Sequence, residues 1–442
     1  MTLEDSDLST TDATLARHRA FAEVLQGDRP MMWSDWASLI EDSQCLTPSG
    51  QSVARWAVDT LQRTLGSDFL QRAGAAPGAH PVFSLGFWPG ANDVPWVYAN
   101  LFQLAAQFEL LTQSRSKDWG KVKQAISSNL EAVGWIHCLL QLELAGLGLR
   151  AGWQSRFEPK LDNGHLADVC LTREGNQLLV ETVSMRMSTH EQEALAFFRT
   201  LAQQLSLLEM QYAVHISGSL GTPLSAEESR QWLQEIGSVA RSVAQNGIIR
   251  LVSNQTGGRL EISREQPTLE TTKLEGDPVT EDGWGRLVAR LNDKARQAKG
   301  AGPVWVRLEE ISGLWHFTPL QGMTLQEKLG VLLPDLQKEL ASFPDLAGVI
   351  LAPAILWAGN AAPERLSARI EREGGIALRS PLPGYRVRES IIVTRAGQAR
   401  EDARIFADWY EQEATWLDWA LEQMGHPPFH TLVQEDPEES GR

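Results

Sequence analysis

The stretch that decides the fold is residues 127–220, which divides into SSNLEAVGWIHCLLQLELAGLGLRAG (127–152), WQSRFEP (153–159), HLADVCLT (165–172), QLLVETVSM (177–185), EQEALAFFRTLAQQLSLLEM (191–210) and QYAVHISGSL (211–220). The first segment predicts a long amphipathic helix that ends near Gly152. The next three segments are short and rich in β-type residues, and REGN (173–176) joins the last two as a hairpin turn. A helix and a strand follow. The predicted order is helix, three strands, helix, strand.

Three carboxylates stand at informative places in this pattern. Glu143 lies in the first predicted helix, Asp168 on the first arm of the hairpin, and Glu181 near the end of the second arm. Neighbouring antiparallel strands lie ~4.8 Å apart, so carboxylates on one face of two strands can share a hard divalent cation. Taken one at a time, each carboxylate is more simply explained as a solvated side chain. Their joint placement favours a magnesium site, which suits phosphodiester chemistry.

The same motifs resemble those of the PD-(D/E)XK, or restriction-endonuclease-like, nucleases. The resemblance rests on LELAGLGLRAGW with Glu143, LADVCL with Asp168 and LLVETV with Glu181, and it covers roughly residues 128–220. It implies a core of one helix, three strands, a helix and a strand. It also implies that these three carboxylates bind magnesium and catalyse phosphodiester cleavage.

One position departs from the family pattern. The family places a lysine two residues beyond the strand glutamate, and Val183 stands there in this chain. Because side chains alternate along a strand, Val183 shares a face with Glu181 and supplies neither charge nor a proton. Two substitutes are conceivable, namely Lys160 in the approach to the hairpin and Arg186 just past its second strand. Arginine would stabilise charge without readily deprotonating water.

The rest of the chain is organised around this core. Residues 1–14 are expected to form a disordered acidic lead, and residues 431–442 an acidic tail. Residues 15–127 carry apolar side chains at helical spacing, which predicts a helical N-terminal region. Residues 128–220 form the nuclease-like core, and residues 221–430 alternate strands with helices. The predicted fold class is α/β, with a restriction-endonuclease-like central core, a helical N-terminal region and an α/β C-terminal extension.

Charge limits the partners of the protein. The 442 residues include 40 basic and 56 acidic side chains, a net charge of −16. A protein that binds nucleic acid along an extended basic surface would show the opposite balance, so any nucleic-acid contact must use a local site or a partner protein. The sequence contains no apolar run long enough to cross a membrane and no secretory signal at its start. We therefore expect no membrane partner and a cytoplasmic location.

Two basic segments attract attention outside the core. SRSKDWGKVK (114–123) is the densest basic cluster of the chain and contains Trp119. It could meet phosphates, although solvated lysines between two helices are the simpler explanation. DKARQAK (293–299) places Lys294 among several polar residues at a predicted helix end, where the helix dipole favours cations without any ligand.

The sequence leaves more than one function open. The first is a magnesium-dependent phosphodiesterase that cleaves DNA or RNA, with Asp168 and Glu181 as metal ligands, Glu143 assisting and Lys160 as the candidate lysine. The alternative is a catalytically degenerate nuclease-like module that binds nucleic acid or a partner protein without cleavage. A third, an interaction protein without a site, also fits.

Overall fold

The protein forms two compact units. The computed structural model describes residues 30–75, 80, 82, 95–184, 189–264, 274–275, 283–309, 323–352, 368–382, 386–395 and 400–434. Unit 1 combines residues 1–185 with residues 284–442, and unit 2 comprises Arg186–Gly283. The expected acidic lead, 1–14, lies outside the described residues.

Six helices make up the described N-terminal part of unit 1, namely α2 (Trp33–Glu41), α3 (Pro48–Leu65), α4 (Phe69–Ala75), α5 (Pro95–Gln113), α6 (Trp119–Ser128) and α7 (Ala132–Arg150). Later in the chain, unit 1 adds α10 (Gly283–Ala298), α11 (Leu325–Ala341), α12 (Arg400–Glu411) and α13 (Trp416–Gln423). Helices cover both faces of the sheet of this unit. Local signals set several of their ends. The Thr47 side chain caps α3 by accepting a hydrogen bond from Gly50 N, and Pro48 occupies its first position, where no amide hydrogen is needed.

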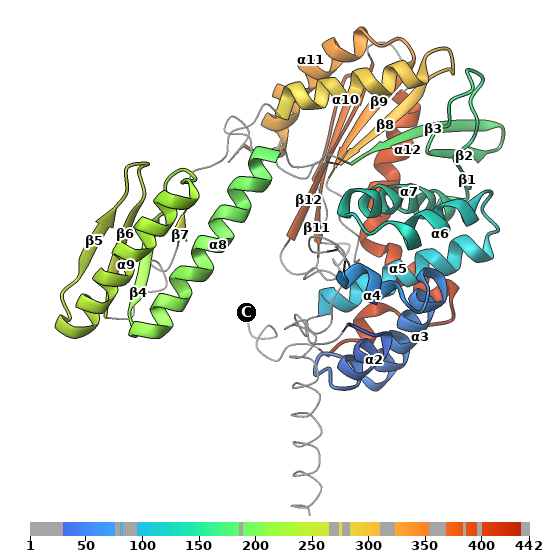
Figure 1. Cartoon of the computed structure of the whole chain (residues 1–442). Coiled ribbons are helices and arrows are strands. Elements are labelled where there is room, and N and C mark those ends of the chain that lie inside the picture. The colour runs from blue at the N-terminus through green and yellow to red at the C-terminus, as the bar shows by residue number, and fades with distance from the viewer. Residues whose placement is uncertain are drawn as a thin grey trace, which may run out of the picture. The chain divides into compact units, whose positions relative to one another are not determined.

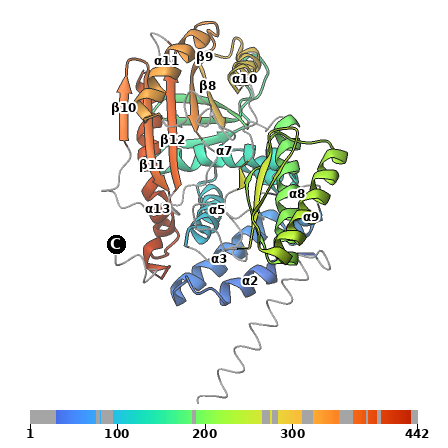
Figure 2. The ribbon, with the colours of Figure 1, turned by 90° about the vertical axis from the view of Figure 1, so that its left-hand side faces the viewer.

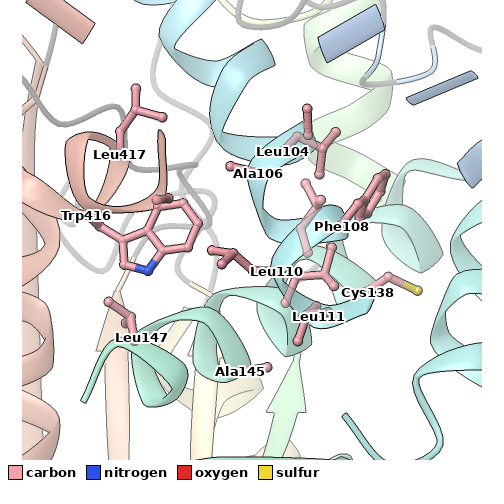
Figure 3. Packing of buried hydrophobic residues seen from close by; sticks show 14 of the residues in the cluster. Leu104, Ala106, Phe108, Leu110, Leu111, Cys138, Ala145, Leu147, Trp416 and Leu417 are labelled. Carbon is pink, nitrogen blue, oxygen red and sulfur yellow. The ribbon is translucent and has the colours of Figure 1, made fainter. Parts of the chain in front are cut away.

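Helix α5 is the centre of the helical region. Nearly every residue from Val97 to Leu111 is buried, which marks a helix surrounded on all sides rather than one with a solvent face. It lies between α7 and α3 (Figure 2). Figure 3 shows part of this core, with side chains from α5, α7 and α13 such as Phe108, Leu147 and Trp416.

A mixed sheet forms the second half of unit 1. Its strands are β1 (Gln154–Phe157), β2 (Val169–Arg173), β3 (Asn176–Val183), β8 (Val304–Glu309), β9 (Leu346–Ala352), β10 (Ala368–Arg372), β11 (Gly375–Leu382) and β12 (Arg386–Thr394). The eight strands are ordered β1-β2-β3-β8-β9-β12-β11-β10. β3, β8 and β9 are parallel neighbours, and the other neighbouring pairs are antiparallel. All residues of β8 and β9 are buried, as expected for parallel strands covered on both faces.

Alternation along the strands separates two cores. On one face Val180 and Trp305 join the core of α5 and α7, together with residues of α12. On the other face Val183 and Val306 pack against leucines of α10 and α11. Figure 1 shows these two helix pairs on opposite sides of the strands. Glu181 and Thr182, adjacent in β3, therefore point toward different helices.

Unit 2 is a smaller α/β unit with a core of its own. It contains α8 (Thr189–Tyr212), β4 (His215–Ser219), α9 (Ala226–Asn246), β5 (Arg250–Ser253), β6 (Arg259–Ser263) and β7 (Leu274–Glu275). The four strands are ordered β5-β6-β4-β7. Both helices cover the same face of this sheet, where Trp232 and Ile236 pack against Leu260 (Figure 2).

The boundaries of the predicted core need correction. The elements expected as its second helix and fourth strand are α8 and β4, and β4 pairs with β6 and β7 inside unit 2. The parallel neighbour of β3 is instead β8, with Glu181 opposite Val306. In unit 1, α10 and β8 complete the order helix, three strands, helix, strand. The pair α8–β4 and the pair α10–β8 show the same local sequence pattern, and only the pairing of their strands distinguishes them.

The expected tail, 431–442, begins with packed residues. Leu432 is buried and Val433 forms a β-bridge with Leu46, so two hydrophobic residues hold the chain end to α3. Residues 435–442 lie outside the described part. Among the helices that the structure describes, none is both long and apolar enough to span a membrane.

Candidate functional site

The structure brings Asp168 and Glu181 together at the end of the β2–β3 hairpin. β2 pairs with β3 in a register that sets Val169 opposite Val180, so Asp168, one residue earlier, stands opposite Glu181. Asp168 Oδ2 accepts hydrogen bonds from Thr182 N at 2.6 Å and Thr182 Oγ1 at 3.0 Å. The side chain of Asp168 thus accepts the backbone hydrogen bond of Thr182 at the point where the backbone pairing of β2 with β3 ends.

Helix α7 contributes two polar side chains from one face. His137 and Gln141 are four residues apart, and their Nε2 atoms each lie 3.4 Å from Asp168 Oδ1. His137 Nδ1 lies 3.2 Å from Thr182 Oγ1, so the histidine contacts both arms of the hairpin. The sequence did not assign these two residues to the site.

Lys294 supplies a cation from the opposite side. Its Nζ atom lies 2.7 Å from Glu181 Oε2 and 3.8 Å from Asp168 Oδ2, and its side chain is 17% exposed. It projects from α10, whose buried residues Leu287 and Leu291 precede it at helical spacing. The helix-dipole interpretation missed this role. The sequence signal that could have identified Lys294 is its position within the apolar stripe of an amphipathic helix.

Charge compensation at this site is incomplete. Burial raises the pKa of Glu181, and the neighbouring Asp168 carboxylate raises it further, to about 7, although Lys294 opposes the shift. Glu181 Oε1 is buried and has no hydrogen-bond partner in the part of the chain that the structure describes. Burial also acts to raise the pKa of Asp168, but His137, Lys294 and the Thr182 N–H outweigh it and hold that pKa well below its usual range. The negative charge of Asp168 is thus compensated by its neighbours, whereas that of Glu181 is compensated only in part, by Lys294.

Glu143 does not join these residues. Its carboxylate is buried and accepts hydrogen bonds from Arg388 Nη2 at 2.8 Å, Tyr410 Oη at 2.7 Å and Arg307 Nη2 at 3.3 Å. Glu143 follows Gln141 by two residues, about 200° around the helix, so the two side chains leave α7 on different sides. The predicted role of Glu143 as an assisting ligand is replaced by a buried charge cluster.

The two conceivable replacement cations do not lie beside the carboxylates in the described contacts. Lys160 is exposed in the β1–β2 connection, where it forms a β-bridge with Leu166, and it makes no described ion pair. Arg186 lies outside the described residues. Val183 is buried among the leucines of α10 and α11, as a valine should be.

A divalent cation would find two carboxylates here. Over the described ranges, no group of three or more histidine, cysteine, aspartate or glutamate side chains is arranged to hold a metal ion. Magnesium, however, is commonly bound by one or two carboxylates, with water and substrate oxygens completing its shell. The unpartnered, buried Oε1 of Glu181 fits such a ligand. Asp168 and Glu181 would hold the ion.

This arrangement combines a carboxylate pair, a lysine and a histidine in one partly exposed place, a combination suited to charge stabilisation at a phosphoryl group. Comparisons with models of protein families, with curated proteins and with solved structures gave no match. The chemistry of the site therefore rests on its geometry.

Proposed function

We propose that this protein is a magnesium-dependent phosphodiesterase that acts on nucleic acid, with Asp168, Glu181 and Lys294 as its reactive centre. The observation that carries the proposal is the position of Lys294, whose Nζ lies 2.7 Å from Glu181 and 3.8 Å from Asp168. This lysine would take over the role of the family lysine for which Val183 stands in the sequence.

The order of elements in unit 1 supports a restriction-endonuclease-like core. Helix α7 is followed by the antiparallel strands β1, β2 and β3, and then, after unit 2, by α10 and by β8, which is parallel to β3. On this interpretation residues 186–283 are an insertion between the third strand and the second helix of the core. The carboxylates lie on β3 and next to β2, and the lysine lies on the helix that follows.

Each residue has a role in this proposal. Asp168 and Glu181 hold the cation, which when bound polarises the phosphoryl oxygen and lowers the pKa of water. The Lys294 ammonium donates hydrogen bonds to the phosphate and offsets the negative charge that develops on it. Asp168 is fixed by Thr182, so its carboxylate is positioned before any ligand arrives. Gln141 and His137 support it from α7.

A cleavage assay on the full chain tests the proposal. Labelled single-stranded and duplex DNA and RNA are incubated with Mg²⁺ or Mn²⁺ and, in parallel, with a chelator. We expect cleavage only with the metal, and a loss of about 100-fold or more in Asp168→Asn, Glu181→Gln and Lys294→Met, the range seen when one charge-stabilising group is removed. Lys328→Met is the matched control, because Lys328, on α11, is also a largely buried lysine paired with a glutamate, Glu389 of β12.

The outcomes separate the alternatives. Equal cleavage by wild type and by the Asp168→Asn/Glu181→Gln double variant would overturn the site. Absence of cleavage on all four substrates with either metal would overturn the enzymatic proposal. Tight binding of nucleic acid without cleavage would then favour the degenerate nucleic-acid-binding module. One observation favours this alternative: the Lys294 ammonium contacts both carboxylates at the place that a metal cation would take.

A further inference from the structure

The basic segment 114–123 is held beside the sheet that carries the site. Lys117 N donates to Ser155 O at 3.1 Å, and Phe157 N donates to Lys117 O at 3.0 Å, which extends the sheet by one residue next to β1. Ser116 Oγ and Ser155 Oγ are 2.7 Å apart. The segment is therefore fixed to the edge of the sheet.

Trp119 anchors the same segment to the core. Its ring is 8% exposed and packs near Phe108 and Phe157, and its Nε1 donates to Thr112 Oγ1 at 3.1 Å. The tryptophan is consequently not a stacking surface for a base. It holds the lysines in place.

The basic side chains share a face of the sheet with the candidate site. Lys117 pairs with Arg156, Arg156 pairs with Cys170, and Cys170 pairs with Leu179, and paired residues point to one face. Glu181 is two residues beyond Leu179 and so lies on that face too. Three strand spacings of ~4.8 Å across the sheet and two residues of ~3.3 Å along β3 separate Lys117 from Glu181, roughly 16 Å in all.

That face of the hairpin is open and polar toward its turn. The row next to Arg156 consists of Gln154, Thr172 and Gln177, which are paired in register and exposed. Nearer the site on the same face, Cys170 and Glu181 are buried. The exposed part of this face therefore lies beside the basic segment, and the carboxylates lie at its buried end.

The charges of the segment are only partly compensated. Asp118 pairs with Lys121 at 3.4 Å and with Arg156 at 3.5 Å. Arg115 and Lys117 are exposed and have no carboxylate partner in the part of the chain that the structure describes. In a chain with a net charge of −16, this local excess of positive charge is unusual.

We infer that the edge formed by residues 115–121 and Arg156, here named the basic edge, binds the phosphates of the strand that carries the scissile bond. This inference rests on the proposed function and adds the surface that holds the substrate. Nucleic-acid strands present one phosphate about every 3.4 Å of axis, so the roughly 16 Å between Lys117 and Glu181 spans about five nucleotides of a stacked strand. The contacts are to the backbone and position the strand without reading its sequence.

Binding in the presence of a chelator tests this surface separately from cleavage. Labelled single-stranded and duplex oligonucleotides of DNA and RNA are titrated with the full chain, and fluorescence anisotropy is recorded across a series of salt concentrations. Lys117→Gln/Lys121→Gln removes two charges. For a single strand we expect the slope of log K against log salt to fall by about 1.4 and the affinity at 0.1 M salt to fall by about 25-fold.

The control is Arg55→Gln/Arg63→Gln, which removes two exposed, ion-paired charges from α3. It should leave both slope and affinity unchanged. Equal effects of the two double variants, or no binding by wild type, would overturn the basic edge. A basic edge that binds only acidic proteins would give no response with oligonucleotides and would overturn it as well. Wild type that binds through the edge but does not cleave with metal would overturn the proposed activity and leave the edge standing.

Discussion

The two buried carboxylate clusters of unit 1 lie on different sides of helix α7 and are built in opposite ways. Around Glu143 a single carboxylate meets two guanidinium groups and a phenol, from Arg307, Arg388 and Tyr410. Around Lys294 two carboxylates share one ammonium group, and Glu181 Oε1 has no hydrogen-bond partner among the described residues. In the ion pairs that the described residues form, one carboxylate meets two cations in the first cluster, and two carboxylates meet one lysine in the second.

The difference separates a cluster whose carboxylate is fully compensated from one whose carboxylates are compensated only in part. Burial tends to raise the pKa of Glu143, but the charges of Arg307 and Arg388 outweigh it and hold that pKa below its usual range. At Glu181 burial and a second carboxylate prevail, and the pKa rises to about 7. A buried acid that lacks compensation is a feature of sites that bind a cation or exchange a proton. The comparison also explains why the charge of Glu143 is compensated although Glu143 is buried, as Glu181 is.

The largest effect that this comparison predicts is the cost of removing the Glu143 charge. Glu143→Gln removes the buried carboxylate that pairs with both Arg307 and Arg388, and removing one partner of a buried ion pair costs about 3–5 kcal/mol. The free energy of unfolding in urea measures it at neutral pH. Glu181→Gln is the matched variant and should cost far less. Similar losses in the two variants would remove the distinction between the clusters.

A smaller effect is expected when Lys294 is removed. Lys294→Met leaves Asp168 and Glu181 facing each other without a cation, and we expect a loss of about 1–3 kcal/mol at pH 8, the usual cost of an unsatisfied buried polar group. Adding Glu181→Gln to this variant should restore most of the loss, because the repulsion disappears. A double variant no more stable than Lys294→Met would show that the lysine acts only through its packing.

The smallest effect is the pH dependence of Glu181. Its pKa is about 7 in the folded chain, above the ordinary value of 4.5, so the folded state binds the proton more tightly than the unfolded state. Stability from this group therefore increases as the pH falls, by roughly 1 kcal/mol from pH 8 to pH 6. Thermal unfolding of wild type and Glu181→Gln in chelator across this range isolates the contribution. Parallel curves for the two proteins would contradict it.

Part of the site was open to prediction from local pattern. The hairpin at REGN forms with Arg173 opposite Asn176, and Glu174 and Gly175 adopt the positive φ angles that such a two-residue turn requires. Alternation along the two arms then sets Asp168 across from Glu181. These relations depend on neighbours in sequence, and for that reason motif spacing was sufficient to find the carboxylate pair.

The lysine was not open to prediction in the same way. Lys294 is 113 residues from Glu181, and the whole of unit 2 lies between them in sequence. A search confined to the strand and its flanks considers Val183, Lys160 and Arg186 and cannot reach α10. Glu143 was misassigned for the same reason. The local carboxylate motif does not reveal that Arg307 and Arg388, on strands distant in sequence, form ion pairs with Glu143.

The sequence by itself determined the mixed α/β class, the hairpin and the acidic pair at its end, since helix period, strand alternation and turn chemistry are local properties. Only the tertiary structure decided that β8 rather than β4 pairs with β3, that Glu143 belongs to a charge cluster, and that Lys294 faces Asp168 and Glu181. The physical reason is that strand pairing and the compensation of buried charge are settled between segments far apart in the chain. No local pattern carries that information.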